Sequence, residues 1–236
     1  MGLINLNFDN MESVWILEGM EFKFKILSSI FVILILNACA TAPKSKPEQV
    51  QTKAPVFLFK TAQWVSTAKV KNFENGGMNH LDIDVMGIRS DQVRMEVAGA
   101  FGTPLASVVI TSTEFRCASH QNKKFYFGKN RMGVLGPLAD LPLDPRDLAK
   151  FIFDEVPVSH GWKCYIGQDQ MLSRCDFESK QIQVKWTERD KLSRRLLITA
   201  PHFEMSWYFN QPQTNVQIKP IAFELNPPAS YSKVQL

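Results

Sequence analysis

Few side chains in this chain of 236 residues could do chemistry, and the main candidates are four cysteines and four histidines. The histidines have neighbours that share no pattern; they are His80, His120, His160 and His202. No His-Glu-x-x-His, Gly-x-Ser-x-Gly or Cys-x-x-Cys motif is present, so the usual sequence patterns of metalloproteases, hydrolases and dithiol enzymes are missing. Asp82 and Asp84 alternate with apolar residues, which is typical of the solvated face of a strand. We therefore expect no catalysis, no metal and no catalytic residue.

The first cysteine, Cys39, stands at the end of an apolar run that begins at Ile26 and follows Lys23 and Lys25. A run of about 13 residues is shorter than the roughly 20 that span a bilayer, so it predicts a cleaved secretory signal. Its last four residues, Leu-Asn-Ala-Cys, resemble a bacterial lipobox, which implies a diacylglycerol on the cysteine sulfur and an acyl group on its amine. The alternative is an ordinary signal peptide cut elsewhere, with Cys39 free. Ala40, in place of Asp, indicates the outer membrane for this class of signal.

The chain divides into four parts by composition. Residues 1–19 carry acidic side chains where a signal would be basic, and we interpret them as an upstream-start artefact. Residues 20–38 form the signal peptide, residues 39–55 a Pro- and Lys-rich acylated tether, and residues 56–236 a domain of ordinary size. From Cys39 onward, 25 basic side chains face 19 acidic ones. This modest excess suits a surface near anionic headgroups, and its diffuse distribution argues against nucleic-acid binding.

Two later cysteines, Cys164 and Cys175, are spaced to face each other across a hairpin that turns at Asp169 and Gln170. A disulfide between them is therefore geometrically available, and an oxidising periplasm permits it. The remaining cysteine, Cys117, alternates with Phe115 in an apolar strand, and we interpret it as a small buried side chain.

Period-two alternation dominates from Trp64 onward and predicts antiparallel strands. We expect a mainly β fold with few helices, an incomplete, half-open antiparallel β-barrel of ten to eleven strands covered by helices. The predicted strands are 79–89, 92–98, 105–111, 114–119, 124–128, 162–166, 172–177, 181–187, 195–199, 205–209 and 216–225.

One helix interrupts the strands. Asp144 is a good N-cap, Pro145 suits the first helical position, and Pro157 closes the segment. Leu148, Phe151 and Ile152 share one face, which we expect to pack on the concave side of the sheet. Residues 55–63 are ambiguous between strand and helix, and we favour a short helix.

Two stretches, with the lipobox, resemble the LolA/LolB half-barrel family, and its LolB-like outer-membrane receptors in particular. The first is Arg94-Met-Glu-Val-Ala-Gly-Ala-Phe-Gly-Thr-Pro-Leu-Ala106, similar to a strand, a tight loop and a returning strand of the family. The second is Leu141-Pro-Leu-Asp-Pro-Arg-Asp-Leu-Ala-Lys-Phe-Ile-Phe-Asp-Glu-Val-Pro157, similar to its helix. The resemblance implies a concave apolar cavity that holds the acyl chains of a lipoprotein.

The resemblance also implies a membrane-insertion loop of Ala100, Phe101 and Gly102, because an apolar residue protrudes there in the receptors. The small residues around Phe101 cannot bury its ring locally, so a turn should offer the ring outward, with folding into the core as the alternative. The cavity-lining candidates, for which plain core packing is an equal interpretation, are Leu81, Ile83, Val85, Val93, Met95, Val97, Phe115, Phe125, Phe127, Leu148, Phe151 and Ile152.

Two functions remain open. The first is an outer-membrane lipoprotein, facing the periplasm of a Gram-negative bacterium, that helps insert a lipidated cargo protein into the membrane. Its partners would be outer-membrane lipids and that cargo, with a periplasmic LolA-like carrier as the candidate donor, and we expect a monomer without further cofactors. The second is an envelope scaffold with a filled barrel, whose interface anchors would be Trp207, Tyr208 and Phe209.

Overall fold

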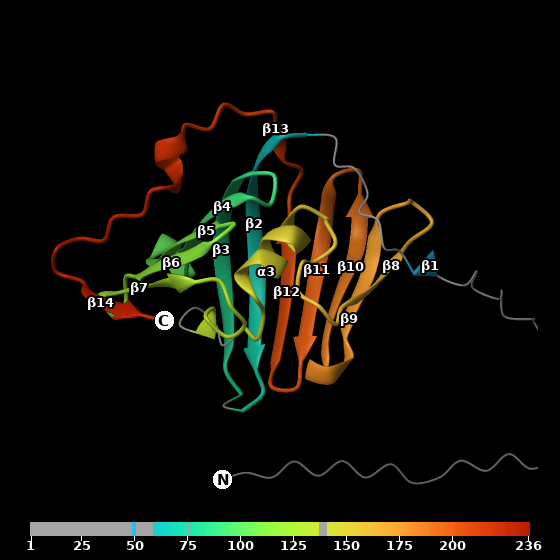
Figure 1. The fold of residues 1–236 in the computed structure, drawn as a ribbon, viewed down its shortest axis with the longest axis horizontal. Helices are drawn as coiled ribbons and strands as arrows, with labels where there is room; N and C mark the ends of the chain where they lie inside the picture. The colour runs from blue at the N-terminus through green and yellow to red at the C-terminus, as the bar shows by residue number, and fades with distance from the viewer. Residues whose placement is uncertain (1–48, 51–58, 75, 137–140) are drawn as a thin grey trace, which may run out of the picture. The chain divides into compact units, whose positions relative to one another are not determined.

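Alternating burial along the strands shapes a single curved sheet. The computed structural model describes residues 49–50, 59–74, 76–136 and 141–236. In this part of the chain, fourteen strands form one sheet: thirteen follow the order β1-β8-β9-β10-β11-β12-β2-β3-β4-β5-β6-β7-β14, and β13 pairs with β2 off this path. The ends of this order do not pair, so the sheet is an open half-barrel that curls around the helix α3 (Pro145–Ile152), as Figure 1 shows. The predicted fold class is confirmed.

Most strand predictions agree with the structure to within a few residues. The eleven strands from β2 to β12 pair antiparallel. The strands are β1 (Gln49–Val50), β2 (Thr61–Asn72), β3 (Met78–Ile88), β4 (Gln92–Ala98), β5 (Pro104–Thr111), β6 (Glu114–Ser119), β7 (Lys124–Lys129), β8 (Lys163–Ile166), β9 (Leu172–Phe177), β10 (Ile182–Asp190), β11 (Ser193–Ala200), β12 (Phe203–Phe209), β13 (Gln213–Thr214) and β14 (Ser232–Gln235).

The helix begins as predicted. The Asp144 carboxylate accepts a hydrogen bond from the backbone N–H of Arg146 at 2.8 Å, and Pro145 occupies the first turn. The helix ends at Ile152, earlier than Pro157. Its apolar stripe of Leu148, Phe151 and Ile152 is buried against the sheet. We call the face of the sheet that α3 covers the inner face and the opposite one the outer face.

Two sequence predictions are wrong. Thr61 to Gln63 are not helical but begin β2, where Ala62 and Trp64 are buried on alternate positions; residues 55–58 of that prediction lie outside the described part. The segment 216–225 is not a strand, because it holds the short 3-10 helix η3 (Pro220–Phe223), and Pro220 has no N–H for a ladder.

The segment after β13 instead covers the outer face of the sheet. Phe223 and Leu225 pack there with Val109 and Phe125 in a small second core. The Arg94 guanidinium donates to the backbone oxygen of Ala222 at 2.8 Å. The chain then ends in β14, which pairs parallel with the edge strand β7, a pairing the sequence did not predict.

Candidate functional site

The loop between β4 and β5 presents Phe101 to solvent. It is the short 3-10 turn η1 (Ala100–Gly102), closed by a hydrogen bond from the N–H of Gly99 to the Thr103 oxygen at 2.9 Å. Phe101 has φ +59°, a left-handed conformation, and its side chain is 106 % exposed. The backbone turn therefore directs the ring away from the core, as the small neighbouring residues suggested. Cys39, the predicted lipidation site, lies outside the described residues.

Among the described residues, side chains from the sheet, from α3 and from the segment after it fill the inner face of the sheet. The predicted cavity residues that lie in its core are Ile83, Val85, Val93, Met95, Phe115, Leu148, Phe151 and Ile152, and the partly buried Leu81 and Val97 pack against it. Aromatic rings pack in two groups: Trp64 lies 5.1 Å from Phe153, and Phe151 lies 5.6 Å from Trp186, between ring centroids. In this structure α3 and the residues after it occupy the trough of the half-barrel.

Four other aromatic predictions are corrected by the strand register and by burial. Phe125 and Phe127 belong to the outer face with the C-terminal segment, because their neighbour Tyr126 takes the inner side. Trp207 and Phe209 were expected as exposed interface anchors, but both are buried in the main core.

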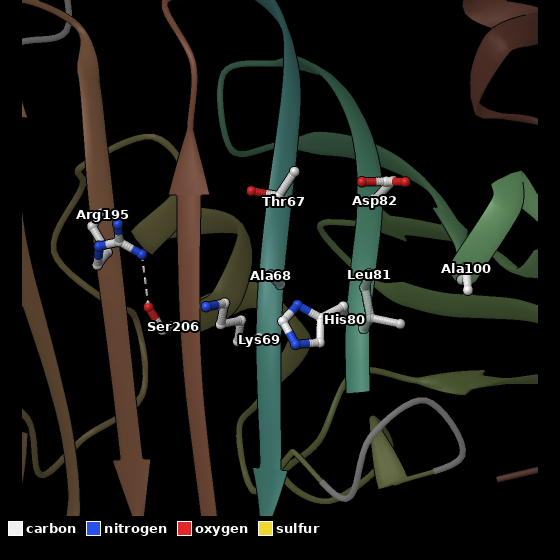
Figure 2. Close-up of a pocket in the computed structure, with 10 residues that line it drawn as sticks. Thr67, Ala68, Lys69, His80, Leu81, Asp82, Ala100, Arg195 and Ser206 are labelled. Atoms are coloured by element: carbon white, nitrogen blue, oxygen red, sulfur yellow. Dashed lines mark hydrogen bonds between the residues drawn. The ribbon is translucent and has the colours of Figure 1, made fainter. Parts of the chain in front are cut away.

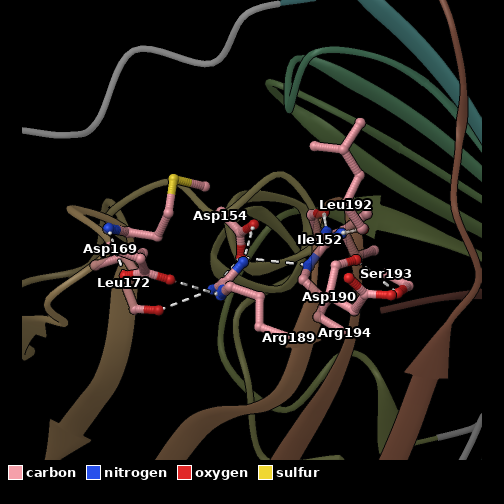
Figure 3. A network of polar contacts seen from close by, with 10 residues as sticks. Ile152, Asp154, Asp169, Leu172, Arg189, Asp190, Leu192, Ser193 and Arg194 are labelled. Carbon is pink, nitrogen blue, oxygen red and sulfur yellow. Dashed lines mark hydrogen bonds and ion pairs between the residues drawn. The ribbon is translucent and has the colours of Figure 1, made fainter.

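A buried ionic network fixes the end of α3 to the sheet (Figure 3). The Arg194 guanidinium, 2 % exposed, donates to the backbone oxygens of Ile152 and Leu192, and its Nε lies 3.3 Å from Asp154 Oδ1. Arg189 Nη1 donates to Asp154 Oδ2 at 2.9 Å. Burial lowers the pKa of Arg194, and the Asp154 charge opposes this shift. Asp154 thus pairs with two guanidinium groups where α3 ends, and Asp169 Oδ2 also lies 3.4 Å from Arg189 Nε.

Asp147 has a role that the sequence did not reveal. It is fully buried, and its carboxylate accepts hydrogen bonds from the backbone N–H groups of Val158 and Ser159 at 2.9 and 3.0 Å. The Trp162 indole N–H donates to its other oxygen at 3.0 Å. Asp147 therefore holds the loop after α3, and it also places a negative charge in the first turn of the helix, near its positive end.

A hollow of about 330 Å³ lies on the outer face between β11, β12, β2 and β3 (Figure 2). The turn at Ala100, next to Phe101, forms one wall. Arg195 donates to the Ser206 hydroxyl at 3.0 Å across the hollow and pairs with Glu188 at 2.7 Å. The other polar lining residues are Thr67, Lys69, His80 and Asp82. The hollow is polar and basic on one side, so it does not resemble a site for an acyl chain.

A cluster of four polar side chains lies elsewhere on the outer face. The Ser107 hydroxyl donates to Glu96 Oε2 at 2.5 Å and lies 3.0 Å from Nε2 of His120, whose Nδ1 lies 2.9 Å from the Tyr231 hydroxyl. Since the one hydroxyl proton of Ser107 is given to Glu96, His120 is not placed to receive it, as a base activating a nucleophile must. We interpret the cluster as a clamp on the C-terminal segment.

The remaining chemical candidates are separate from one another. His80, His160 and His202 are exposed on different elements, and Asp82 and Asp84 lie on the outer face of β3. Within the described ranges, no group of three or more His, Cys, Asp or Glu side chains could hold a metal. The same residues contain no helix that is long and apolar enough to span a membrane.

Cys164 and Cys175 form a disulfide across the β8–β9 hairpin, directly opposite each other as predicted, with Cα atoms 4.1 Å apart. The predicted register holds as far as Tyr165 and Arg174 and then shifts by one residue. Cys117 is fully buried, and burial raises the pKa of its thiol to about 12. It is therefore a packing residue.

Comparison with known proteins gives likenesses of arrangement only. No family model and no curated protein matches the sequence. A LolA superfamily protein from Nitrosomonas europaea is 7% identical, with a TM-score of 0.49 over 70% of this chain and 90% of that one. A DUF1329 family protein from Desulfovibrio piger is 7% identical, with a TM-score of 0.47 over 71% and 90%. A Vibrio parahaemolyticus domain described as an outer membrane lipoprotein-sorting protein is 9% identical, with a TM-score of 0.45 over 69% and 88%.

Proposed function

We propose that this protein is a LolB-like lipoprotein that transfers lipidated proteins into the outer membrane. Cys39 carries the diacylglycerol and acyl group that hold it at the periplasmic side of that membrane. The half-barrel takes the acyl chains of a cargo protein on its inner face, with a LolA-like periplasmic carrier as the donor. Neither catalysis nor a further cofactor is involved.

The single observation that carries this proposal is the exposure of Phe101. A phenyl ring that is 106 % exposed on a well-formed turn is unfavourable in water. Its transfer into lipid is favourable by about 1.5–3 kcal/mol, which supports reversible contact but not anchoring. Stable attachment is left to the acyl chains, at about 0.8 kcal/mol for each buried methylene. Two contacts of such different strength suit a protein that stays at a membrane and repeatedly touches it.

The inner face supports the proposal only in combination with movement of α3. Phe151 and Ile152 fill the trough and have no exposed surface, so an acyl chain enters when the helix moves aside. Once α3 has moved, the chain would meet an apolar surface that includes Val85, Phe115 and Trp186.

The test separates cargo binding from cargo delivery. The acylated protein in vesicles is loaded with a fluorescent lipopeptide, and uptake and release into the bilayer are measured for wild type and Phe101→Glu. Loss of about 1.5–3 kcal/mol predicts a delivery rate roughly 10- to 100-fold lower, with unchanged uptake. Ile221→Glu is the matched control, because Ile221 is 66% exposed but lies on η3. Equal delivery by both variants, or no saturable uptake by wild type, contradicts the proposal.

The filled trough favours a second candidate, an envelope scaffold that binds a protein partner and no lipid. This candidate predicts that detergent extracts yield one stoichiometric partner protein, while mass spectrometry finds no bound acyl chain apart from the covalent ones. Saturable uptake of the lipopeptide by wild type excludes it.

A further inference from the structure

The hairpin between β2 and β3 carries exposed apolar side chains at its tip. Phe73 is 55% exposed and Met78 is 57% exposed, although Met78 belongs to a strand whose other apolar residues are buried or partly buried. Backbone hydrogen bonds hold the described residues beside the tip: the N–H of Asn72 donates to the Gly77 oxygen at 2.9 Å, and that of Phe73 to the His202 oxygen at 3.0 Å. The backbone therefore holds these two side chains in water.

This hairpin and the Phe101 loop lie at the same end of the sheet. Ala100, adjacent to Phe101, lines the outer hollow together with His80. His80 is two residues from Met78 on β3, a distance of about 7 Å along a strand. The exposed Ile221 lies far from this end, because η3 is held near Arg94, and Arg94 pairs with Met86. From Met78 to Met86 the strand rises about 26 Å.

Two ion pairs lie at this end of the sheet. Lys71 pairs with Glu204 at 2.8 Å, and His202 lies 3.6 Å from Glu74. Lys69, in the hollow behind the tip, has no ion pair among the described residues and is exposed. Apolar tips backed by a free ammonium group fit a phospholipid surface, where acyl chains lie beneath phosphates.

We propose that the β2–β3 hairpin is a second lipid-contacting element, in which Phe73 and Met78 enter the bilayer beside Phe101 and Lys69 faces the headgroup phosphates. The inference rests on the proposed function, since it assumes that Phe101 touches the membrane. Contact through two loops fixes the orientation of the sheet on the bilayer, which contact through one loop cannot do.

The test places a fluorophore at single positions of the full acylated protein in phosphatidylethanolamine and phosphatidylglycerol vesicles with brominated acyl chains. Phe73→Cys, Phe101→Cys and Ile221→Cys are labelled in turn, because the native cysteines do not compete: Cys39 is acylated under the proposed function, Cys117 is buried, and Cys164 is bonded to Cys175. If Phe73→Cys fails to reach the wild-type melting temperature, Glu74→Cys on the same exposed tip replaces it.

The proposal predicts loss of fluorescence at positions 73 and 101 and no loss at position 221. Lys69→Glu should reduce the quenching at position 73, whereas Lys219→Glu, also exposed, should not. Quenching at 101 without quenching at 73 overturns this inference and leaves the proposed function intact, while quenching at neither position overturns both. Contact between labels of two protein copies at position 73, in place of lipid quenching, assigns the tip to a dimer and overturns the proposal.

Discussion

The buried carboxylate of Asp154 should be among the most stabilising polar groups in the protein. Its oxygens lie 2.9 Å from Arg189 Nη1 and 3.3 Å from Arg194 Nε, and the side chains of Asp154 and Arg194 are each 2% exposed. Asp154→Ala leaves the buried Arg194 with no anion among the described residues and leaves Arg189 with only the more exposed Asp169. Breaking a buried pair in this way costs about 3–5 kcal/mol, because the remaining charge stays desolvated.

Urea unfolding followed by tryptophan fluorescence measures this cost. With a slope of about 2 kcal/mol per molar urea, the midpoint should fall by about 1.5–2.5 M. Asp169→Ala is the matched control, since Asp169 contacts the same Arg189 at 3.4 Å but its side chain is 48% exposed. An exposed pair contributes at most about 1 kcal/mol, so the control should fall by less than about 0.5 M. Equal midpoints for the two variants would refute the assignment of Asp154 as the buried counter-ion.

Three further predictions concern stability and reactivity. Replacing both Cys164 and Cys175 by alanine should lower the free energy of unfolding by about 3 kcal/mol, measured by thermal melts with the wild type as reference. An unchanged melting temperature would show that the disulfide does not constrain the unfolded chain. Burial raises the pKa of the Cys117 thiol from 9.0 to about 12, so the thiol should react with Ellman's reagent only after unfolding. Its contribution to stability should be complete below pH 9 and lost between about pH 9 and 12. Rapid reaction of the native protein at pH 8 would contradict this prediction. In Gly128→Ala the new Cβ would lie 2.8 Å from the Leu236 oxygen, which is too close and should weaken the pairing of β14 with β7. Amide hydrogen exchange at residues 232–235 should therefore accelerate while β5 stays protected. Slow exchange at residues 232–235 would show that β14 tolerates the contact.

The strands were predictable where one face alone is buried. In β3, Ile83 and Val85 alternate with the exposed Asp82 and Asp84, so the sequence itself shows which side of the strand is buried. The disulfide and the exposure of Phe101 followed from equally local facts: hairpin spacing and a run of small residues. Helix α3 began where its capping residue predicted.

Long-range packing could not be predicted in this way. Phe125 and Phe127 are apolar like inner-face residues, but the distant C-terminal segment covers them on the outer face. Arg194 stands in a polar-looking Ser-Arg-Arg sequence, and its burial depends on the end of α3, which lies about forty residues earlier in the chain. The filled state of the trough is also a property of volume, which residue types alone do not report.

The claim that the trough takes acyl chains can be tested by photocrosslinking. The acylated protein is incubated with a fatty acid that carries a diazirine at its chain end, and the labelled residues are mapped by mass spectrometry. The account predicts saturable labelling of inner-face residues, with Phe151 and Trp186 among them, and its loss when unlabelled fatty acid competes. Labelling confined to outer-face residues such as Phe125 or Lys69, or no saturable labelling at all, would contradict it.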